Sequence, residues 1–394
     1  MSGFFHNLEL DAAGKTRYHI DTKKRKGVLR NMKVFHQSIV AKADDRFYGW
    51  PANCGMWSWQ NEENGRTEIL LGLIEGYHLA DHGTGHAIDE TRARHTIFAR
   101  SLDGGETWAL ERPDLPWPDV KGLEEIEPDE EGDNAWIPLL QDPMDFTAPG
   151  FALMFQNMST HYPSRSWFYY TYDKGHTWFG PYRVPTFCKG MSMRTDYTVL
   201  DSQTLFVGMT GTREDGHEGI TFAARLCDGG LRWERLGTMG EEPVNGFRIM
   251  PSTCILPDGS YVSATRYCIK GGVRRLEFFK STDAGLTWKK ISDVGASDDQ
   301  KAGNPPAMRL LADGRLLVVY GKRDAPHGMI AHTSADGGYT WSEPFYLRRD
   351  SECADLGYPR MIVRPDGMAV TAYYYSPTED SLRFIGSTIF DPAE

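Results

Sequence analysis

Residues 334–341 read SADGGYTW, a run of small residues, one aspartate and two glycines that ends in Thr-Trp. We call this eight-residue pattern the octet. Four earlier copies are SLDGGETW from 101, TYDKGHTW from 171, a diverged LCDGGLRW from 226, and STDAGLTW from 281. The last three intervals between the starts are 55, 55 and 53 residues. Self-similarity at such a spacing indicates a propeller or another repeat array.

Each repeat can be divided into four short strands. From residue 247 the chain reads FRIMPSTCIL, a PDG turn, SYVSATRYC, the loop IKGGV, RRLEFFKS and the octet turn, whose final Thr-Trp begins the strand TWKKIS. Runs of β-branched and aromatic residues between Gly, Asp and Pro are strand signals, and four antiparallel strands make one propeller blade. We predict an all-β, six-bladed β-propeller that forms a single domain over residues 1–394. Seven blades would need one more blade near the N-terminus.

The N-terminal segment 1–49 contains KVFHQSIVA at 33–41, which has the composition of a strand. The sixth blade, from Tyr358, has room for only three strands before the chain ends. We therefore expect strand 33–41 to supply the fourth and to close the ring. Residues 109–134 include GLEEIEPDEEGDN and are predicted to be an acidic surface insertion.

Composition excludes several classes of protein. A formal net charge of −11 argues against a nucleic-acid partner, although a local arginine pocket can still attract an acidic ligand. Six scattered cysteines without CxxC spacing predict buried thiols, not a zinc site or a disulfide framework. No apolar run is long enough to span a membrane, and no signal peptide is visible. We expect a cytoplasmic protein if the chain is complete, and a periplasmic or secreted one if a signal peptide has been removed.

The octet has the form S-x-D-x-G-x-T-W of the Asp-box, or BNR, repeat, and the chain resembles the sialidase superfamily of β-propellers. GFRIMPSTCILPDG at 246–259 is similar to the F-R-I-P segment of that family, with Met250 as an extra residue. The segments from 304 and 355 are similar to blades 5 and 6 of sialidase-like proteins. Because the superfamily also holds lyases and rhamnosidases that act beside glucuronic acid, the resemblance constrains the chemistry only loosely. We expect the octet itself to be structural, its Asp accepting backbone N–H groups and its Trp wedging between strands or blades.

Binding residues are expected on one face of the ring. There the starts of the first strands and the loops after the second strands surround the axis, the usual place for a pocket. The predicted substrate-binding residues are Trp50, Asn53, Arg194, Arg248, Arg323, Tyr358 and Arg360. Arg194, Arg248 and either Arg323 or Arg360 would hold a carboxylate, because a guanidinium group binds one through two parallel hydrogen bonds. The alternative for each arginine is a role at the surface or in blade packing.

The loop 76–94 of the first blade is rich in histidine. His82, His86 and Asp89 are candidate acid or base catalysts near neutral pH. His78, His82 and His86 would share one face of a helix and form a metal site, but the neighbouring glycines disfavour a helix there. Exposed loop histidines are the alternative. We predict no metal and no cofactor.

Sialidases start their first blade with F-R-I-P and have, in the following loop, an aspartate that acts as the acid. This chain instead has WPANCGMWSW, without arginine, at 50–59. The resemblance also implies a tyrosine nucleophile with a glutamate partner late in the chain. Tyr374 or Tyr375 matches the tyrosine, and strand alternation places these two on opposite faces. No glutamate stands out as the partner, which leaves a retaining sialidase mechanism open to doubt.

Together these features favour an enzyme. The leading hypothesis is a sialidase-like, exo-acting glycoside hydrolase that removes a terminal acidic sugar, sialic-acid-like or uronate-linked, from an acidic oligosaccharide or polysaccharide. One alternative is a polysaccharide lyase that cleaves beside a uronic acid by means of His and Tyr. The other is a glycan-binding propeller without catalysis. The pattern does not specify the sugar, the stereochemical course or the oligomeric state.

Overall fold

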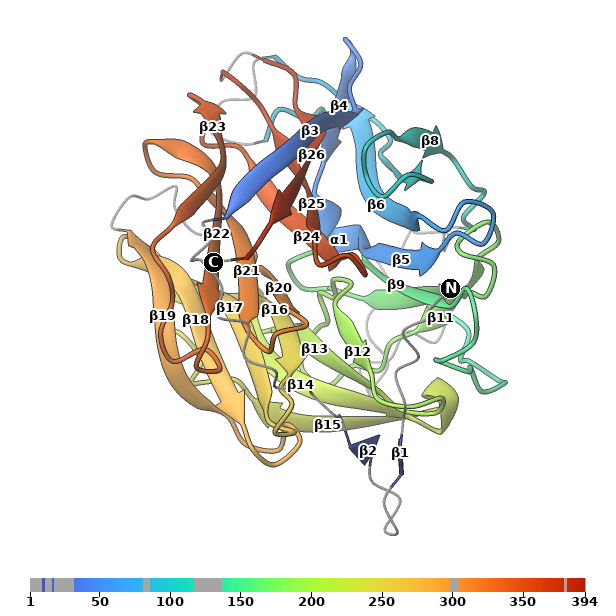
Figure 1. The fold of residues 1–394 in the computed structure, drawn as a ribbon. Coiled ribbons are helices and arrows are strands. Elements are labelled where there is room, and N and C mark those ends of the chain that lie inside the picture. The colour runs from blue at the N-terminus through green and yellow to red at the C-terminus, as the bar shows by residue number, and fades with distance from the viewer. Residues whose placement is uncertain are drawn as a thin grey trace.

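The structure is a computed structural model that describes residues 32–80, 86–116, 137–297, 304–378 and 381–393. It also gives the backbone of two short paired strands, β1 (Glu9–Leu10) and β2 (Thr16–Arg17). Six antiparallel sheets stand around a central axis and form a β-propeller (Figure 1). The prediction of six blades is confirmed. Within the described ranges, no helix is long and apolar enough to cross a bilayer.

Blades 3, 4 and 5 follow the predicted four-strand pattern, and their first strands contact one another around the axis. Blade 3 consists of β12 (Tyr197–Val199), β13 (Leu205–Thr212), β14 (Glu218–Cys227) and β15 (Arg232–Thr238). Blade 4 consists of β16 (Gly246–Ile255), β17 (Tyr261–Ile269), β18 (Arg274–Ser281) and β19 (Lys289–Ser297). Blade 5 consists of β20 (Ala307–Leu310), β21 (Leu316–Lys322), β22 (His327–Ser334) and β23 (Phe345–Ser351).

Blade 6 joins the two ends of the chain. It consists of β24 (Gly357–Val363), β25 (Ala369–Tyr375), β26 (Phe384–Asp391) and the N-terminal strand β3 (Lys33–Ala41). The dark-blue β3 lies beside the red β26 in Figure 1, and their antiparallel pairing runs from Asp391 opposite Lys33 to Ile385 opposite Ala41. The predicted closure of the ring by strand 33–41 is therefore confirmed.

Blades 1 and 2 depart from the four-strand pattern. In blade 1, β4 (Arg46–Gly49) and β5 (Met56–Gln60) both pair with β6 (Thr67–Tyr77), which is followed by β7 (His95–Ser101) and β8 (Ala109–Glu111). One helical turn, α1 (Pro51–Cys54), interrupts the first strand of this blade. Blade 2 shows three strands among the described residues, namely β9 (Ala152–Asn157), β10 (Ser166–Thr171) and β11 (Phe179–Arg183).

The interruption in blade 1 has a local cause. Trp50 has a left-handed backbone with φ of 53°, and Pro51 follows at the first helical position, which proline favours. Gly55, with φ of 113°, returns the chain to the strand direction. Of the predicted acidic insertion 109–134, residues 109–111 form β8, and residues 117–134 lie outside the described residues.

The octet forms the turn between the third and fourth strands of a blade. In blade 1, the Gly105 backbone N–H donates to the hydroxyl of Ser101 at 2.8 Å, and the Thr107 N–H donates to the carboxylate of Asp103 at 3.0 Å. The indole N–H of Trp108 donates to the Gly105 carbonyl at 3.1 Å. The same three bonds recur in the octets that start at 171 and 281. The aspartate and the small residues therefore hold the turn together.

The octet tryptophans also join neighbouring blades. Trp178 of blade 2 stacks on Phe98 of blade 1, with ring centroids 5.2 Å apart. Trp341 of blade 5 packs against Phe278 of blade 4 at 4.3 Å. Buried apolar side chains fill the space between blades, and strands such as β21 and β25 are buried on both faces. The six cysteines are free thiols, five of them buried.

Candidate active site

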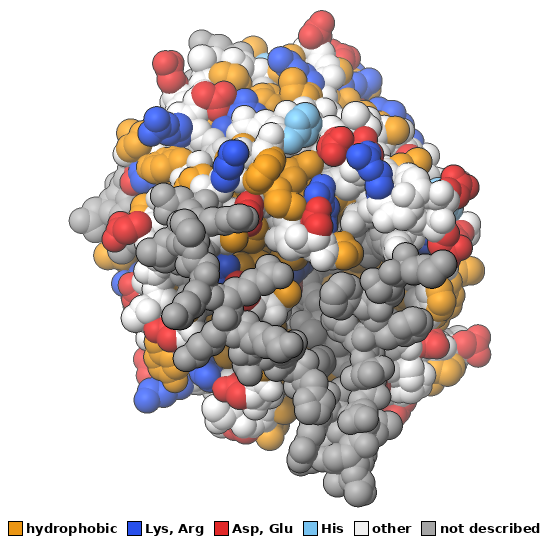
Figure 2. All heavy atoms as spheres, in the orientation of Figure 1, with side chains coloured by type: hydrophobic (Ala, Val, Ile, Leu, Met, Phe, Trp, Pro, Cys, Tyr) orange, Lys and Arg blue, Asp and Glu red, His pale blue; other side chains and the backbone are white. Residues whose placement is uncertain are grey.

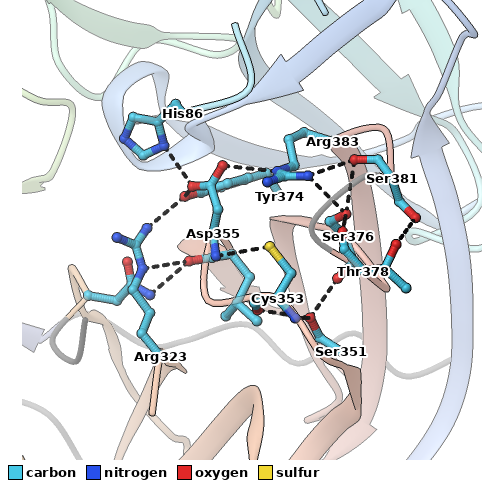
Figure 3. Close-up of polar contacts among 12 residues, drawn as sticks. His86, Arg323, Ser351, Cys353, Asp355, Tyr374, Ser376, Thr378, Ser381 and Arg383 are labelled. Atoms are coloured by element: carbon cyan, nitrogen blue, oxygen red, sulfur yellow. Dashed lines mark hydrogen bonds and ion pairs between the residues drawn. The ribbon is translucent and has the colours of Figure 1, made fainter. Parts of the chain in front are cut away.

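A cluster of polar side chains lies around the start of blade 6, with Asp355 at its centre (Figure 3). One carboxylate oxygen of Asp355 accepts a hydrogen bond from the Tyr374 hydroxyl at 2.6 Å and lies 2.6 Å from Nδ1 of His86. The other oxygen accepts a hydrogen bond from Nε of Arg383 at 2.9 Å. His86 comes from the loop after β6, Tyr374 from β25 and Arg383 from the start of β26. The closed ring therefore brings blades 1 and 6 together at this carboxylate.

Burial and charge fix the protonation of the cluster. Burial alone would raise the pKa of Asp355, but the hydrogen bond and charge of His86, together with the charge of Arg323, hold it well below its usual range. Tyr374 is fully buried, and burial raises its pKa well above the usual value. Asp355 is thus an ionised acceptor and Tyr374 a neutral donor. The side chain of His86 is 35% exposed, so its ring can be reached from solvent.

Two further arginines extend the cluster along the face. Arg323 donates to the Tyr374 hydroxyl at 2.6 Å and to the Leu356 carbonyl at 3.1 Å. Arg266 donates to the hydroxyl of Tyr358 at 3.1 Å, and the guanidinium groups of both arginines lie within 6 Å of the Tyr358 ring centre. With Arg383, the described contacts of this cluster contain three guanidinium groups and one carboxylate, that of Asp355. The described part of the cluster therefore carries more basic than acidic groups, in a protein whose net charge is −11.

Two aromatic residues of the site, Trp50 and Tyr358, have a strained backbone. Trp50 and Tyr358 have φ values of 53° and 49°, which bulky side chains rarely adopt. The Trp50 ring packs edge-on against His86, with centroids 5.1 Å apart. Met250, the extra residue in the F-R-I-P-like segment, also has a left-handed φ of 56° and lies in a break of register between β16 and β17. The insertion in the sequence is therefore a β-bulge.

Arg194 and Arg360 meet at a second place, on the axis. Arg360 donates to Asp196 at 2.7 Å and to the Ala52 carbonyl, and Arg194 donates to Glu218 at 2.5 Å. Burial lowers the pKa of Arg360 to about 10, which leaves it cationic at neutral pH. Both arginines line one small cavity, whose remaining walls are Ala52, Gly208, Thr210, Met250, Pro251, Pro305 and Pro306.

Residues 124–370, more than half of the chain, match the model of the BNR repeat-like domain. The chain belongs to the BNR repeat-like family. This membership confirms the resemblance to propellers of the sialidase superfamily. Comparison with curated protein sequences gave no match.

Solved structures show how widely this BNR repeat-like fold is shared. A protein of unknown function from Dyadobacter fermentans has a TM-score of 0.65 and 17% identity, over 92% of this chain and 99% of that chain. An α-L-arabinanase from Penicillium chrysogenum, solved with arabinobiose, has a TM-score of 0.53 and 13% identity over 91% and 99%. The NanB sialidase from Streptococcus pneumoniae has a TM-score of 0.54 and 12% identity over 90% and 70%. At these identities the likeness shows the fold alone.

The BNR repeat-like ring brings part of the predicted site together. Five of the predicted residues lie in or against the Asp355 cluster, namely Trp50, His86, Arg323, Tyr358 and Tyr374. Arg194 and Arg360 converge at the axial cavity instead. In the described part of the face shown in Figure 2, basic and acidic side chains are interspersed around a group of hydrophobic ones. The catalytic and binding roles of the predicted site residues stay predictions.

Other predicted residues lie elsewhere. Arg248 pairs with Glu277 at 2.7 Å and packs over Phe279, inside blade 4 and against blade 3. Tyr375 points to the opposite side of β25 from Tyr374, towards Phe384, as strand alternation predicts. Asp89 accepts hydrogen bonds from the backbone and hydroxyl of Thr91.

Two further predictions concern the axis and the histidine-rich loop. Asn53, in α1, accepts the backbone N–H of Thr195 through its own carbonyl at 3.3 Å. His82 lies outside the described residues, so the three-histidine metal site is not tested. Across the ranges that the structure describes, no three His, Cys, Asp or Glu side chains gather in a metal-binding group.

Three members of the cluster are not among the predicted site residues, although the end of the second strand of blade 4 places Arg266 on the predicted binding face. Asp355 stands two residues before Gly357, where β24 begins, so its position on the binding face was a usable signal. Arg266 lies near the end of β17, which reaches the same face. Arg383 is fully buried at the start of β26, and no local pattern distinguishes it from other arginines.

Proposed function

We propose that this propeller is a carbohydrate-active enzyme that cleaves a glycosidic bond at or beside an acidic sugar, with the Asp355 cluster as its active site. The observation that carries the proposal is the contact between Nδ1 of His86 and Asp355. A carboxylate that holds one ring nitrogen orients the imidazole and leaves Nε2 for proton transfer. The partial exposure of His86 makes this nitrogen accessible to a bound glycan.

The arginines support an acidic substrate. Arg266 and Arg323 lie beside Tyr358, which is partly exposed. Guanidinium groups bind carboxylates strongly, and an exposed aromatic ring offers an apolar face to a sugar. A carboxylate near Tyr358 would therefore be held within reach of the His86 and Asp355 pair.

Hydrolysis is the first form of this proposal. The arabinanase and sialidase that share the fold act on glycosides, as their names state. Tyr374 is fully enclosed, so it is a poor candidate for a nucleophile. Tyr358 is partly exposed and lies beside two guanidinium groups. We assign attack at the sugar carbon to Tyr358, which loses its phenolic proton to solvent, and proton donation to the leaving oxygen to protonated His86. Water then breaks the bond between tyrosine and sugar and restores the tyrosine.

Elimination beside a uronic acid is the second form, and a specific observation favours it. Hydrolases of the common type use two carboxylates, whereas Asp355 is the carboxylate in contact with His86 and Tyr374 among the described residues. In elimination, His86 removes the proton next to the uronate carboxylate, which Arg323 neutralises. The bond to the leaving sugar oxygen then breaks, that oxygen takes up a proton, and a double bond forms in the uronate ring.

A product assay separates these forms. The protein is incubated with sialosides, with uronate-containing glycans and with neutral arabinan. New reducing ends without ultraviolet absorbance indicate hydrolysis, and new reducing ends with the absorbance of an unsaturated uronate indicate elimination. Binding of an acidic glycan without any new reducing end would leave only a glycan-binding propeller and would overturn the proposal, as would cleavage of the neutral glycan alone.

A further inference from the structure

The axial cavity is a candidate site that is separate from the Asp355 cluster. None of the residues in that cluster lines it. Its walls come from α1, from β13, β16 and β24, and from residues that precede β12 and β20, so it lies where blades 3 to 6 meet. Three of its wall residues, Pro251, Pro305 and Pro306, are prolines without a backbone N–H. The space accommodates about one water-sized species.

Two residues that line this cavity each carry a buried donor without an acceptor among the described residues. These are the Nε atoms of Arg194 and Arg360, which belong to side chains 8% and 3% exposed. Both Nη atoms of Arg360 donate to carboxylate or carbonyl oxygens, and Nη1 of Arg194 donates to the Ser192 carbonyl and to Glu218. Neither guanidinium group can therefore turn to find another partner without losing these bonds. A buried charged group whose donor is unsatisfied is costly, and such groups are usually compensated.

A third donor completes the set. The hydroxyl oxygen of Thr210 accepts a hydrogen bond from the Met250 backbone N–H at 2.9 Å, which leaves its own hydrogen free to donate. The local charge is also positive. Glu218 and Asp196 balance Arg194 and Arg360, and Arg309 adds a further guanidinium 3.8 Å from Asp196.

We propose that this cavity binds one monatomic anion of the halide class, chloride under ordinary conditions, between Nε of Arg194 and Nε of Arg360. The donor set favours an anion over water, because a water molecule also needs acceptors for its two hydrogens. The size excludes the carboxylate of a sugar, which carries a ring with it.

Such an ion would have a structural consequence. Arg194 precedes β12 in blade 3, and Arg360 lies in β24 of blade 6. These blades stand opposite each other in a ring of six. One anion held by both arginines would link opposite sides of the propeller, and it would stabilise the folded state in proportion to its occupancy.

Bromide tests the proposal directly. Crystals of the whole protein are soaked in sodium bromide, and anomalous difference density is measured at the bromine edge. We expect a peak between Arg194 and Arg360. Ordered density there without an anomalous signal at saturating bromide would show water and would overturn the proposal.

Thermal unfolding provides an independent measure in solution. At matched ionic strength, chloride and bromide should raise the Tm in a saturable manner relative to gluconate. Arg194→Gln should weaken the apparent halide affinity at least tenfold, whereas the exposed Arg66→Gln should leave it unchanged. If Arg194→Gln does not fold, Thr210→Val replaces it. An equal halide response in the cavity variant and the control would contradict a halide site. No readout depends on catalysis, so the outcome is independent of the proposed function.

Discussion

The imidazole of His86 and the carboxylate of Asp355 lie 2.6 Å apart, although 269 residues separate them in the chain. The contact exists because blade 6 is completed by the N-terminal strand β3 and then adjoins blade 1. The carboxylate of Asp355 also accepts hydrogen bonds from the fully buried Arg383 and from the hydroxyl of Tyr374. This carboxylate is therefore important both for proton transfer by His86 and for the stability of the closed ring.

Asp355→Asn tests the structural part of that role. The variant removes the carboxylate charge that Nε of the buried Arg383 meets at 2.9 Å, so we expect the free energy of unfolding to fall by about 3–5 kcal/mol at pH 7. Urea denaturation measures the change. Asp350→Asn removes an exposed carboxylate that pairs with Arg348 and should cost much less. Equal losses of unfolding free energy in the two variants would show that Asp355 stabilises the protein no more than an exposed carboxylate does.

The pH dependence of stability follows from the lowered pKa of Asp355. A carboxylate whose pKa is lower in the folded state contributes its full stabilisation above its unfolded pKa, about 3.9, and loses it as the pH falls further. The difference in unfolding free energy between wild type and Asp355→Asn should thus shrink as the pH falls below about 4. A difference that stays constant down to pH 3 would contradict the ionised state assigned to Asp355.

The repeat explains why the fold could be predicted and the site only in part. The hydrogen bonds of the octet join residues at most four positions apart. The local sequence therefore determines the turn, and the turn recurs with each blade. Arg248 shows the limit of such local reading. Its motif suggested a carboxylate clamp, but Glu277, 29 residues later, is the carboxylate that it meets. Contacts of this kind depend on how blades face each other, which one repeat does not reveal.

Trp178→Ala tests whether the octet tryptophans join the blades. The Trp178 ring lies between Trp57 and Phe98 of blade 1, so its removal should destabilise the protein by about 3–5 kcal/mol. Tyr339 is an exposed aromatic residue in the octet of blade 5, and Tyr339→Ala should have a small effect. Thermal and urea unfolding compare the two. Similar stabilities would mean that the tryptophan is dispensable.

Arg266→Gln tests the preference for an acidic substrate. Loss of one charged donor should raise the KM for an acidic glycan about 10- to 100-fold. It should leave the KM for the same glycan with its carboxylate amidated unchanged. Arg225 pairs with Glu234 in blade 3, away from the cluster, and Arg225→Gln serves as the control. An equal effect of Arg266→Gln on the acidic and amidated glycans would argue against a carboxylate site.

The most direct test of the central claim is the turnover of an acidic glycan by His86→Gln. Because His86 is partly exposed, the variant should keep the wild-type Tm, while kcat falls about 10²- to 10⁴-fold through the loss of the proton-transfer group. His176→Gln alters an exposed histidine in the blade 2 octet and should retain full activity. A folded His86→Gln variant with wild-type kcat on the cleaved glycan would show that the His86 and Asp355 pair is not the active site.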